Sequence, residues 1–524
     1  MKILVTEPIS EEGVGVLSKS AQVDVKLGLK HGELLKKIGQ YDALIVRSET
    51  KVTSEVIEAG HKLQVVARAG IGVDNIDVEA ATHKGIVVVN APVSNTVSAA
   101  EHTVAMMLSL ARHIPQAHTC LKGGTWTRSC FMGVELRNKT LGIVGLGNVG
   151  SEVARRVQGF KMRVVGYDPF ISPEYVRNIG VEMVSLEELL KDSDFITLHL
   201  PLKSSTKGLI GAKELMMVKP CVRIVNCARG GLIDEEELLK ALDDGRVAGA
   251  AMDVFIHEPC TDSVLLQSDK VIVTPHLGAS TIEAQANVAV DIAEQVVAVL
   301  EGNPARYAVN APLVPPEVFA MQGPFIKATL VLGRLVSQLV DGQMSSIDIG
   351  YEGDVGNQDT SALKAATLGG ILEGTTEERV NLVNAGVIAQ RRGLRVIEYR
   401  TPTCENYSSL VSVGVTASEG NTTVAGTVMR GEIHIVRINE YWLDLVHTPG
   451  YFLFIDHRDR PGLIGAVGMI TGKGDVNISF MQLSRLEPRG RALMVLALDE
   501  PLKEEQRQEI LALSDVHAVR MVQL

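Results

Sequence analysis

The sequence has few of the features that place a chain in a membrane or on nucleic acid. Its 524 residues contain no apolar run of about 18 residues, the length that a membrane-spanning helix needs. The first ten residues, MKILVTEPIS, lack the long apolar core of a signal peptide. The net charge is −11, and no run of Lys and Arg typical of nucleic-acid binding occurs. We therefore expect neither a membrane nor a nucleic-acid partner.

Cysteine is also scarce. The six cysteines form no CxxC pair and no dense framework, which favours free thiols in a reducing cytoplasm. Hydrophobic residues make up 46% of the chain and charged residues 22%, so it can fill ordinary globular cores. At this length a single core is excluded, and three or four domains are expected.

Two segments of the chain alternate β-branched runs with helical stretches, the pattern of a parallel sheet covered by helices. The first occupies residues 1–96, and the second begins at Thr140 and holds about six strands. Helices are expected at Ser98–Ala111, between the two series, and at about 281–300, after the second. The fold class is therefore α/β, with two doubly wound, Rossmann-like parallel sheets.

The C-terminal part of the chain has a different pattern. A proline-rich passage at Asn310–Pro316 marks a domain boundary. Beyond it we expect amphipathic helices and then alternating strands over Leu410–Val446, an α+β domain. From Tyr451 to the end the order is βαββαβ, which describes a ferredoxin-like sandwich.

The sharpest local motif is a GxGxxG turn formed by Gly145, Gly147 and Gly150, placed between a strand and a helix. Its glycines permit a tight turn, close approach of a pyrophosphate and close helix–strand packing. The helix then presents free N–H groups to the anion. Asp168 follows 23 residues after Gly145 and can accept hydrogen bonds from ribose hydroxyls, which favours NAD over NADP. The alternative is a structural glycine turn with an incidental surface acid.

Three further sites stand just after later strands of the second series. Arg229 can grip a carboxylate, and His276 can exchange a proton with an alcohol near neutral pH. Glu258 can hold the imidazole and favour its protonated form. Each also has an ordinary interpretation, as a surface arginine, a helix-entry histidine and a solvated acid, because spacing alone does not show that they converge.

The motifs GLGNVG, YDP, NCARGG, DVF with HEP, and PHLGAS occur in this order, together with RAGIGVDNID at 68–77 and NAP…SAAEH. With them the chain resembles the D-isomer-specific 2-hydroxyacid dehydrogenases over essentially its full length. It is most similar to the long branch with an intervening domain and a C-terminal ACT domain. The resemblance implies a discontinuous substrate-binding domain (1–96 and 282–306), an NAD-binding domain (97–281), an intervening allosteric-type domain (307–446) and an ACT regulatory domain (447–524).

The resemblance also implies an activity, the NAD-dependent oxidation of 3-phospho-D-glycerate to 3-phosphohydroxypyruvate, the first step of L-serine biosynthesis. Arg229 is then the carboxylate-binding arginine, His276 the acid–base and Glu258 its orienting partner. Substrate contacts are expected from Arg47, Arg68 and Gly70 besides Arg229, and no metal is implied. Cofactor contacts are expected from Gly145, Gly147, Asn148, Val149, Gly150, Asp168, Cys227, Ala228, Arg229, Asp253, His276, Leu277, Gly278 and Ala279. Ile71 departs from the family, in which many members have a hydroxyl residue there.

In the ACT domain the resemblance implies an effector site at His457, Asp459 and Asn477, with L-serine as a possible ligand. Serine-sensitive relatives often have Asn where this chain has Asp459, which loses an amide donor and adds a negative charge. The alternative is a domain that serves only to build an oligomer, and we expect a homodimer or homotetramer.

Two other functions remain open from the sequence. The same catalytic residues would serve a reductase of glyoxylate, hydroxypyruvate or another 2-oxo acid, although shorter relatives do that work without the two C-terminal domains. A non-catalytic, NAD-sensing protein similar to a corepressor is the third possibility.

Overall fold

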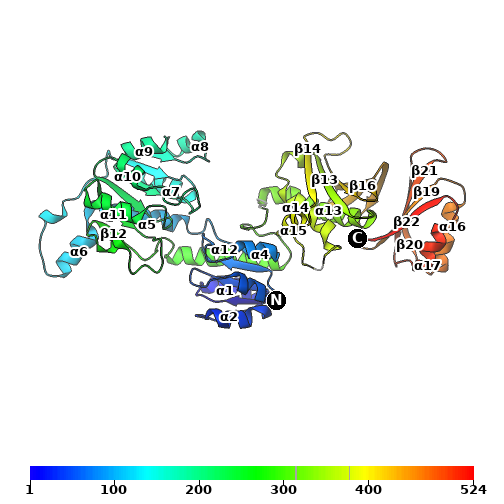
Figure 1. The fold of residues 1–524 in the computed structure, drawn as a ribbon, viewed down its shortest axis with the longest axis horizontal. Helices are drawn as coiled ribbons and strands as arrows, with labels where there is room; N and C mark the ends of the chain where they lie inside the picture. The colour runs from blue at the N-terminus through cyan, green and yellow to red at the C-terminus, as the bar shows by residue number, and fades with distance from the viewer. Residues whose placement is uncertain (313–315, 377) are drawn as a thin grey trace.

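The computed structural model describes residues 1–312, 316–376 and 378–524, and within these ranges the strands form four sheets (Figure 1). The second sheet lies at one end of the molecule and the fourth at the other. None of the helices in the described ranges combines the length and the apolar character that crossing a bilayer requires.

The first domain is built on a five-stranded parallel sheet in the order β2-β1-β3-β4-β5. Separate apolar clusters cover its two faces, so its central strands are buried. The long helix α12 (Ile282–Leu300) returns from the second domain and packs on α1, where Gly13 leaves room for the backbone of Ala289. The other elements are β1 (Lys2–Val5), α1 (Glu11–Ser18), β2 (Gln22–Val25), α2 (His31–Lys37), β3 (Ala43–Val46), α3 (Ser54–Ala59), β4 (Val65–Arg68), α4 (Val78–His83) and β5 (Val87–Val89).

The second domain has a seven-stranded parallel sheet in the order β12-β11-β10-β9-β6-β7-β8. The chain runs outward from β6 to β8 and restarts beside β6 with β9, so the strand order reverses there, where doubly wound sheets bind ligands. Its strands are β6 (Thr140–Val144), β7 (Arg163–Tyr167), β8 (Glu182–Met183), β9 (Phe195–Leu198), β10 (Val222–Asn226), β11 (Val247–Met252) and β12 (Val271–Val273). Its helices are α5 (Thr96–Arg112), α6 (Ile114–Lys122), α7 (Asn148–Val157), α8 (Pro173–Asn178), α9 (Leu186–Asp192), α10 (Ala212–Met217) and α11 (Glu235–Asp243).

The third domain has a mixed six-stranded sheet in the order β14-β13-β15-β16-β17-β18, in which only β13 and β14 pair in parallel. It contacts the first domain, since the side-chain amide of Asn381 donates to the carbonyl of Gly85 at 2.6 Å. Its elements are α13 (Pro316–Leu339), β13 (Met344–Gly353), α14 (Ser361–Glu373), α15 (Ala385–Arg391), β14 (Arg395–Thr401), β15 (Ser409–Ala417), β16 (Gly420–Met429), β17 (Glu432–Ile438) and β18 (Tyr441–Val446).

The C-terminal domain is a βαββαβ unit whose antiparallel sheet has the order β20-β21-β19-β22. The expected ferredoxin-like arrangement is therefore present. Its elements are β19 (Tyr451–Arg458), α16 (Leu463–Lys473), β20 (Ile478–Arg485), β21 (Arg491–Leu498), α17 (Glu504–Leu511) and β22 (Val516–Gln523).

The structure adds elements that the pattern did not predict. Strand β2 reads QVDV and lies partly exposed at the edge of the first sheet, and β8 has only two residues, so neither shows a strong apolar signal. Residues 308–310 still pair with β5, and the side chain of Asn310 bonds the backbone of Val88. The contacts of the first domain thus extend past the boundary expected at residue 306.

Candidate active site

The glycine turn connects β6 to α7 at the reversal of strand order. Gly145 has a φ of +96°, and a side chain there would collide with the carbonyl of His199 at the end of β9. Gly150 leaves no room for a Cβ against the carbonyl of Gly145, whereas Gly147 faces open space. The turn is therefore packed on the protein side and open on the other, the cradle that a dinucleotide pyrophosphate needs.

Asp168 stands at the end of β7 beside this turn. One carboxylate oxygen accepts the backbone N–H of Leu146 at 2.9 Å, and the other accepts that of Phe170 at 2.9 Å. These bonds fix the carboxylate at the strand end, where it is partly exposed. The position fits the expected contact with ribose hydroxyls and leaves a 2′-phosphate facing a negative charge.

His199 lies beside the glycine turn and is a residue that the sequence does not single out. It directly follows β9, and its Nε2 lies 3.1 Å from the hydroxyl of Thr197. Burial lowers the pKa of His199 to about 4, so the ring is neutral at physiological pH. Its place just after a strand at the reversal could have identified it.

The loops after β11 and β12 bring two of the predicted residues together. Nδ1 of His276 lies 2.7 Å from Oε2 of Glu258. Burial raises the pKa of Glu258, but the hydrogen bond and charge of His276 and the N–H of Phe255 outweigh it and hold the pKa below its ordinary value. Glu258 is therefore an ionised acceptor, and Nε2 of the imidazole is left for proton exchange with a substrate.

Asp253 shapes the loop that carries His276. Its carboxylate accepts the backbone N–H groups of Leu277 at 2.7 Å and Gly278 at 2.9 Å and the hydroxyl of Thr274 at 2.6 Å. These bonds hold His276 at a φ of +54°, a conformation that a non-glycine residue adopts only when its surroundings fix it. The side chain of Asp253 has no exposed surface, and its Oδ1 also lies 3.2 Å from Nε2 of His102. Asp253 positions the loop that carries His276, and its contact with the cofactor stays a prediction.

Arg229 crosses the cleft between the first two domains. The side chain of Asn226 bonds the backbone of Ala228 and Arg229 and fixes the turn after β10. The guanidinium then reaches the first domain, where its Nε lies 3.9 Å from Oδ2 of Asp74. A side chain at Gly72 would collide with both groups. Arg229 is thus placed to bind an anion between the two domains.

The first domain contributes two more arginines near Arg229. Arg68 lies at the end of β4, and among the described residues nothing hydrogen-bonds its buried Nε. Burial, followed by the nearby charge of Arg229, lowers the pKa of Arg68 to about 10. Arg47 adds a further positive charge, and its backbone N–H donates to Glu7 at 2.8 Å. The charges of Arg47 and Arg229 both act on Arg68, so the three guanidinium groups lie near one another.

The comparisons with known proteins agree with this geometry. Residues 104–278 match the family described as D-isomer specific 2-hydroxyacid dehydrogenase, NAD binding domain, and residues 321–439 match the D-3-phosphoglycerate dehydrogenase intervening domain. D-3-phosphoglycerate dehydrogenase of Synechocystis is 45% identical, with 100% of this chain and 95% of that protein aligned. That of Bacillus subtilis is 42% identical, with 100% and 99% aligned. The chain belongs to the D-3-phosphoglycerate dehydrogenase family.

Solved structures resemble part of the chain. A glyoxylate reductase from Paecilomyes thermophila matches with a TM-score of 0.55 and 31% identity, covering 59% of this chain and 98% of that one. A D-lactate dehydrogenase from Aquifex aeolicus, complexed with NAD and lactic acid, matches with a TM-score of 0.54 and 27% identity, covering 60% and 100%. The chain is thus an NAD-dependent dehydrogenase of the D-3-phosphoglycerate dehydrogenase family.

Cys227 is a further predicted cofactor position of this family member. Cys227 follows β10, and burial and then the charge of Asp253 raise the pKa of its thiol to about 12. Cys227, Asp253 and His102 form a group whose possible metal-ligating atoms lie within 4.8 Å of one another. The protonated thiol and the fully bonded carboxylate fit a metal poorly.

The three expected effector residues do not form one pocket within a chain. His457 is 1% exposed, with Nδ1 3.2 Å from the carbonyl of Ile455. Asp459 follows β19 and bonds Arg485, which pairs with Ala492 near the start of β21. Asn477 instead bonds Asp499, which directly follows the other end of β21. Because β21 separates Asp459 from Asn477, a ligand that touches both would have to lie between two copies of the domain.

Proposed function

We propose that the chain oxidises 3-phospho-D-glycerate to 3-phosphohydroxypyruvate with NAD, as the first step of L-serine biosynthesis. The observation that carries the proposal is that Arg229, which lies near Arg47 and Arg68, stands on a loop that packs at Gly230 against the backbone of Phe255, in the loop that carries Glu258, the partner of His276. A substrate with a carboxylate and a phosphate needs more cationic partners than a simple 2-hydroxy acid does. The Synechocystis and Bacillus subtilis relatives, aligned over nearly their full lengths, carry this enzyme's name.

The chain's residues divide the reaction between positioning and proton transfer. Arg229 binds the substrate carboxylate and holds C2 in the cleft, while Arg68 and Arg47 bind the phosphate. When bound, NAD would supply the acceptor for the hydride that leaves C2. Nε2 of His276 takes the proton of the C2 hydroxyl, and the Glu258 carboxylate stabilises the imidazolium that results. In the reverse direction the same imidazolium returns the proton.

A substrate panel tests this proposal. NADH formation with 3-phosphoglycerate, D-glycerate and D-lactate, and NADH consumption with glyoxylate and hydroxypyruvate, are compared as kcat/KM. We expect the phosphorylated substrate to be preferred by at least about 100-fold, the value of one charge-assisted contact or more. A preference for glyoxylate would favour the reductase alternative. Absence of turnover with every substrate, despite NAD binding, would favour the corepressor-like alternative.

We also propose that two copies of the chain form a homodimer through the segment around α6, with a homotetramer as the larger possibility. This segment projects from the second domain (Figure 1), and four of its large apolar side chains are exposed. They are Ile114, Leu121, Trp126 and Met132, between 52% and 81% exposed. Such a surface favours contact with another protein. Light scattering of the chain and of a Trp126→Ser, Met132→Ser variant tests it, because the variant should be shifted towards monomer.

L-serine as an effector of the C-terminal domain and a cytoplasmic location complete the proposal. Two copies of the domain would be needed to bring Asp459 and Asn477 onto one serine molecule. The cytoplasmic location is supported by the six cysteines, all of which are free in the described residues and fit a reducing compartment. Inhibition of NADH formation by serine, lost in Asn477→Ala, is the expected result, and a serine-insensitive enzyme would leave the domain with an assembly role.

A further inference from the structure

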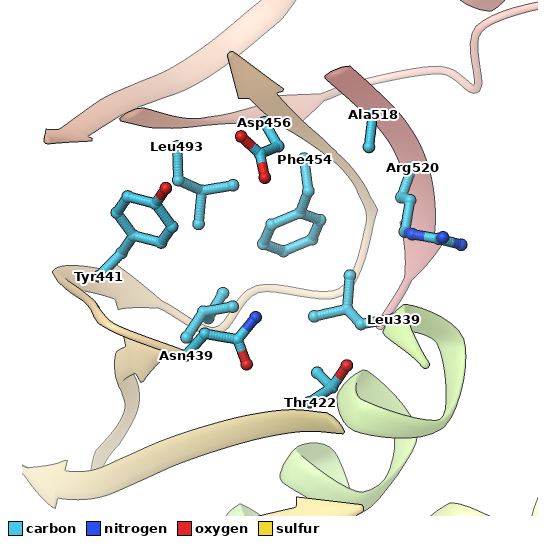
Figure 2. Close-up of a pocket in the computed structure, with 10 residues that line it drawn as sticks. Leu339, Thr422, Asn439, Tyr441, Phe454, Asp456, Leu493, Ala518 and Arg520 are labelled. Atoms are coloured by element: carbon cyan, nitrogen blue, oxygen red, sulfur yellow. The ribbon is translucent and has the colours of Figure 1, made fainter. Parts of the chain in front are cut away.

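Carboxylates inside the chain are paired in different ways in its different parts. The third and C-terminal domains share one apolar core, and Asp456, which lines the cavity between them (Figure 2), pairs with Arg491, a side chain that is 68% exposed. The side chain of Asp253 in the second domain has no exposed surface, and among the described residues its basic partner is His102, which is 19% exposed. The pair of His102 and Asp253 therefore lies inside the protein, where the loss of a partner is felt strongly.

The ring of His102 donates to two oxygen atoms at once. Its Nε2 lies 3.2 Å from Oδ1 of Asp253 and 3.3 Å from the hydroxyl oxygen of Thr274. Burial raises the pKa of Asp253, but the hydrogen bonds of His102 and Thr274 and the N–H of Leu277 outweigh it and hold the pKa below its ordinary value. The ionised carboxylate only accepts, and the Thr274 hydroxyl donates its own hydrogen to Oδ1 at 2.6 Å. Nε2 of His102 therefore carries a hydrogen, which it shares between these two oxygens.

Helix α5, which carries His102, holds the loop after β12 at both ends. Ser98 stands one turn before His102 on the same side of the helix and donates its hydroxyl hydrogen to the carbonyl of Gly278 at 2.9 Å. His102 contacts Thr274 at the other end of this segment. His276 lies midway between the two contacts. The helix thus fixes the ends of the short segment on which the proposed proton acceptor stands.

The backbone of this segment needs such support. His276 has a φ of +54°, which a non-glycine residue keeps only when its surroundings fix it. The position of the segment also sets the contact of 2.7 Å between Nδ1 of His276 and Oε2 of Glu258, which belongs to another loop. A misplacement of about 1 Å is enough to lower a catalysed rate by about 100-fold. A support that holds this segment in place therefore affects the rate of proton transfer.

We propose that His102 is a positioning residue for the reaction. Its Nε2–H holds Oδ1 of Asp253 and the hydroxyl of Thr274, and through them it keeps the loop that carries His276 in the conformation that proton transfer needs. The inference rests on the proposed role of His276 as the proton acceptor. It adds a residue from α5, which contacts neither the substrate nor the cofactor in this mechanism, to the groups that set the rate.

Two amide substitutions of different length test this role. His102→Gln places a side-chain N–H near the position of Nε2, whereas His102→Asn is one methylene group shorter and does not reach the two oxygens. At saturating NAD we expect His102→Gln to keep kcat within about threefold of wild type and His102→Asn to lose about 10- to 100-fold. The KM for 3-phosphoglycerate should stay within about threefold in both, because Arg229 stands on another loop.

Controls separate positioning from a contribution to folding alone. A purely structural contact would lower the melting temperature of His102→Asn and leave kcat per folded enzyme unchanged, and that result would overturn the proposal. An equal loss of kcat in His102→Gln and His102→Asn would overturn it too, because the donor would then not matter. His102→Phe, which keeps a ring and removes the donor, replaces His102→Asn if that variant does not fold. His61→Asn, at an exposed histidine of the first domain, should keep kcat within about twofold.

The same substitution in a His276→Ala background shows whether His102 acts through this loop. We expect His102→Asn to lower the residual kcat of His276→Ala by at most about threefold, because the group that it positions is already absent. A loss of 10- to 100-fold in both backgrounds would overturn the proposal. Normal kcat in His276→Ala alone would contradict the role of His276 and with it the inference. A strong loss in His276→Ala with normal kcat in His102→Asn would contradict the inference alone.

Discussion

Nδ1 of His276 lies 2.7 Å from Oε2 of Glu258, and this contact joins the loop after β12 to the loop after β11. The carboxylate only accepts, so it fixes the ring with Nδ1 protonated and Nε2 directed to proton exchange. Glu258→Gln keeps the size but removes the charge that stabilises the imidazolium. We expect kcat to fall by about 100-fold, with NADH affinity within about twofold, by steady-state kinetics and fluorescence titration. An unchanged kcat would remove Glu258 from the mechanism.

Removing the charge of Asp74 should improve the binding of substrate rather than impair the reaction. Asp74 is 78% exposed and stands 3.9 Å from Arg229, so it competes with an anionic substrate for this cation. Asp74→Asn should lower the KM for 3-phosphoglycerate by about two- to fivefold, the value of an exposed ion pair, with little change in kcat. Asp74→Glu should behave like wild type.

A matched control for Asp74 is Glu79→Gln, an exposed acid on α4 that is not paired with Arg229. A rise of KM in Asp74→Asn would show instead that Asp74 orients Arg229. Arg229→Ala is expected to raise KM by about 10- to 100-fold, because a charge-assisted contact is lost.

Asp168 should decide the choice of dinucleotide. Its carboxylate is held at the end of β7 by the N–H groups of Leu146 and Phe170 and would repel a 2′-phosphate. Asp168→Ala should reduce the ratio of kcat/KM for NAD over NADP by at least about tenfold. An unchanged ratio would contradict the ribose role.

Glu7 supports the loop that follows β3, and its ionisation should make the stability of the chain depend on pH. It accepts the backbone N–H groups of Arg47, Glu49 and Thr50 at 2.8 to 3.1 Å. Burial raises the pKa of Glu7, but these bonds outweigh it and hold the pKa below its ordinary value of 4.5. Since the folded pKa is the lower one, the stabilisation is complete above about pH 4.5 and is lost as the pH falls through the folded value.

Glu7→Gln should therefore unfold at lower temperature than wild type at pH 7, with a cost of about 1–2 kcal/mol for its poorer acceptor. The difference between the two melting temperatures should shrink below pH 4.5 and should not shrink between pH 8 and pH 6. A difference that is constant from pH 8 to pH 3 would show that the charge of Glu7 is not involved. The control is Glu11→Gln, an exposed acid nearby.

Much of the site follows from local sequence, and its supporting residues do not. GLGNVG, Arg229, Glu258 and His276 stand just after strands, where a parallel sheet gathers its ligand-binding residues. Glu7 and His199 stand after β1 and β9 in the same way, so that rule could have found them. The bonds from the Asp253 carboxylate to the loop beside it could not be predicted, because they depend on the folded backbone.

In the C-terminal half, too, the local elements could be predicted from the sequence but the contacts between them could not. The βαββαβ order was readable because each element is a short local pattern, whereas the opposite positions of Asp459 and Asn477 along β21 depend on strand pairing. The shared core of the third and C-terminal domains depends on contacts between segments far apart in the chain. Such contacts leave no local pattern in the sequence.

The most direct test of the account is turnover of His276→Ala with 3-phosphoglycerate and NAD, measured alongside NADH affinity of the same preparation. We predict that kcat falls by about 10²- to 10⁴-fold, the range of general acid–base catalysis, while the NADH dissociation constant stays within about threefold. A variant that binds NADH normally and keeps kcat within about twofold of wild type would contradict the assignment of His276 as the proton acceptor.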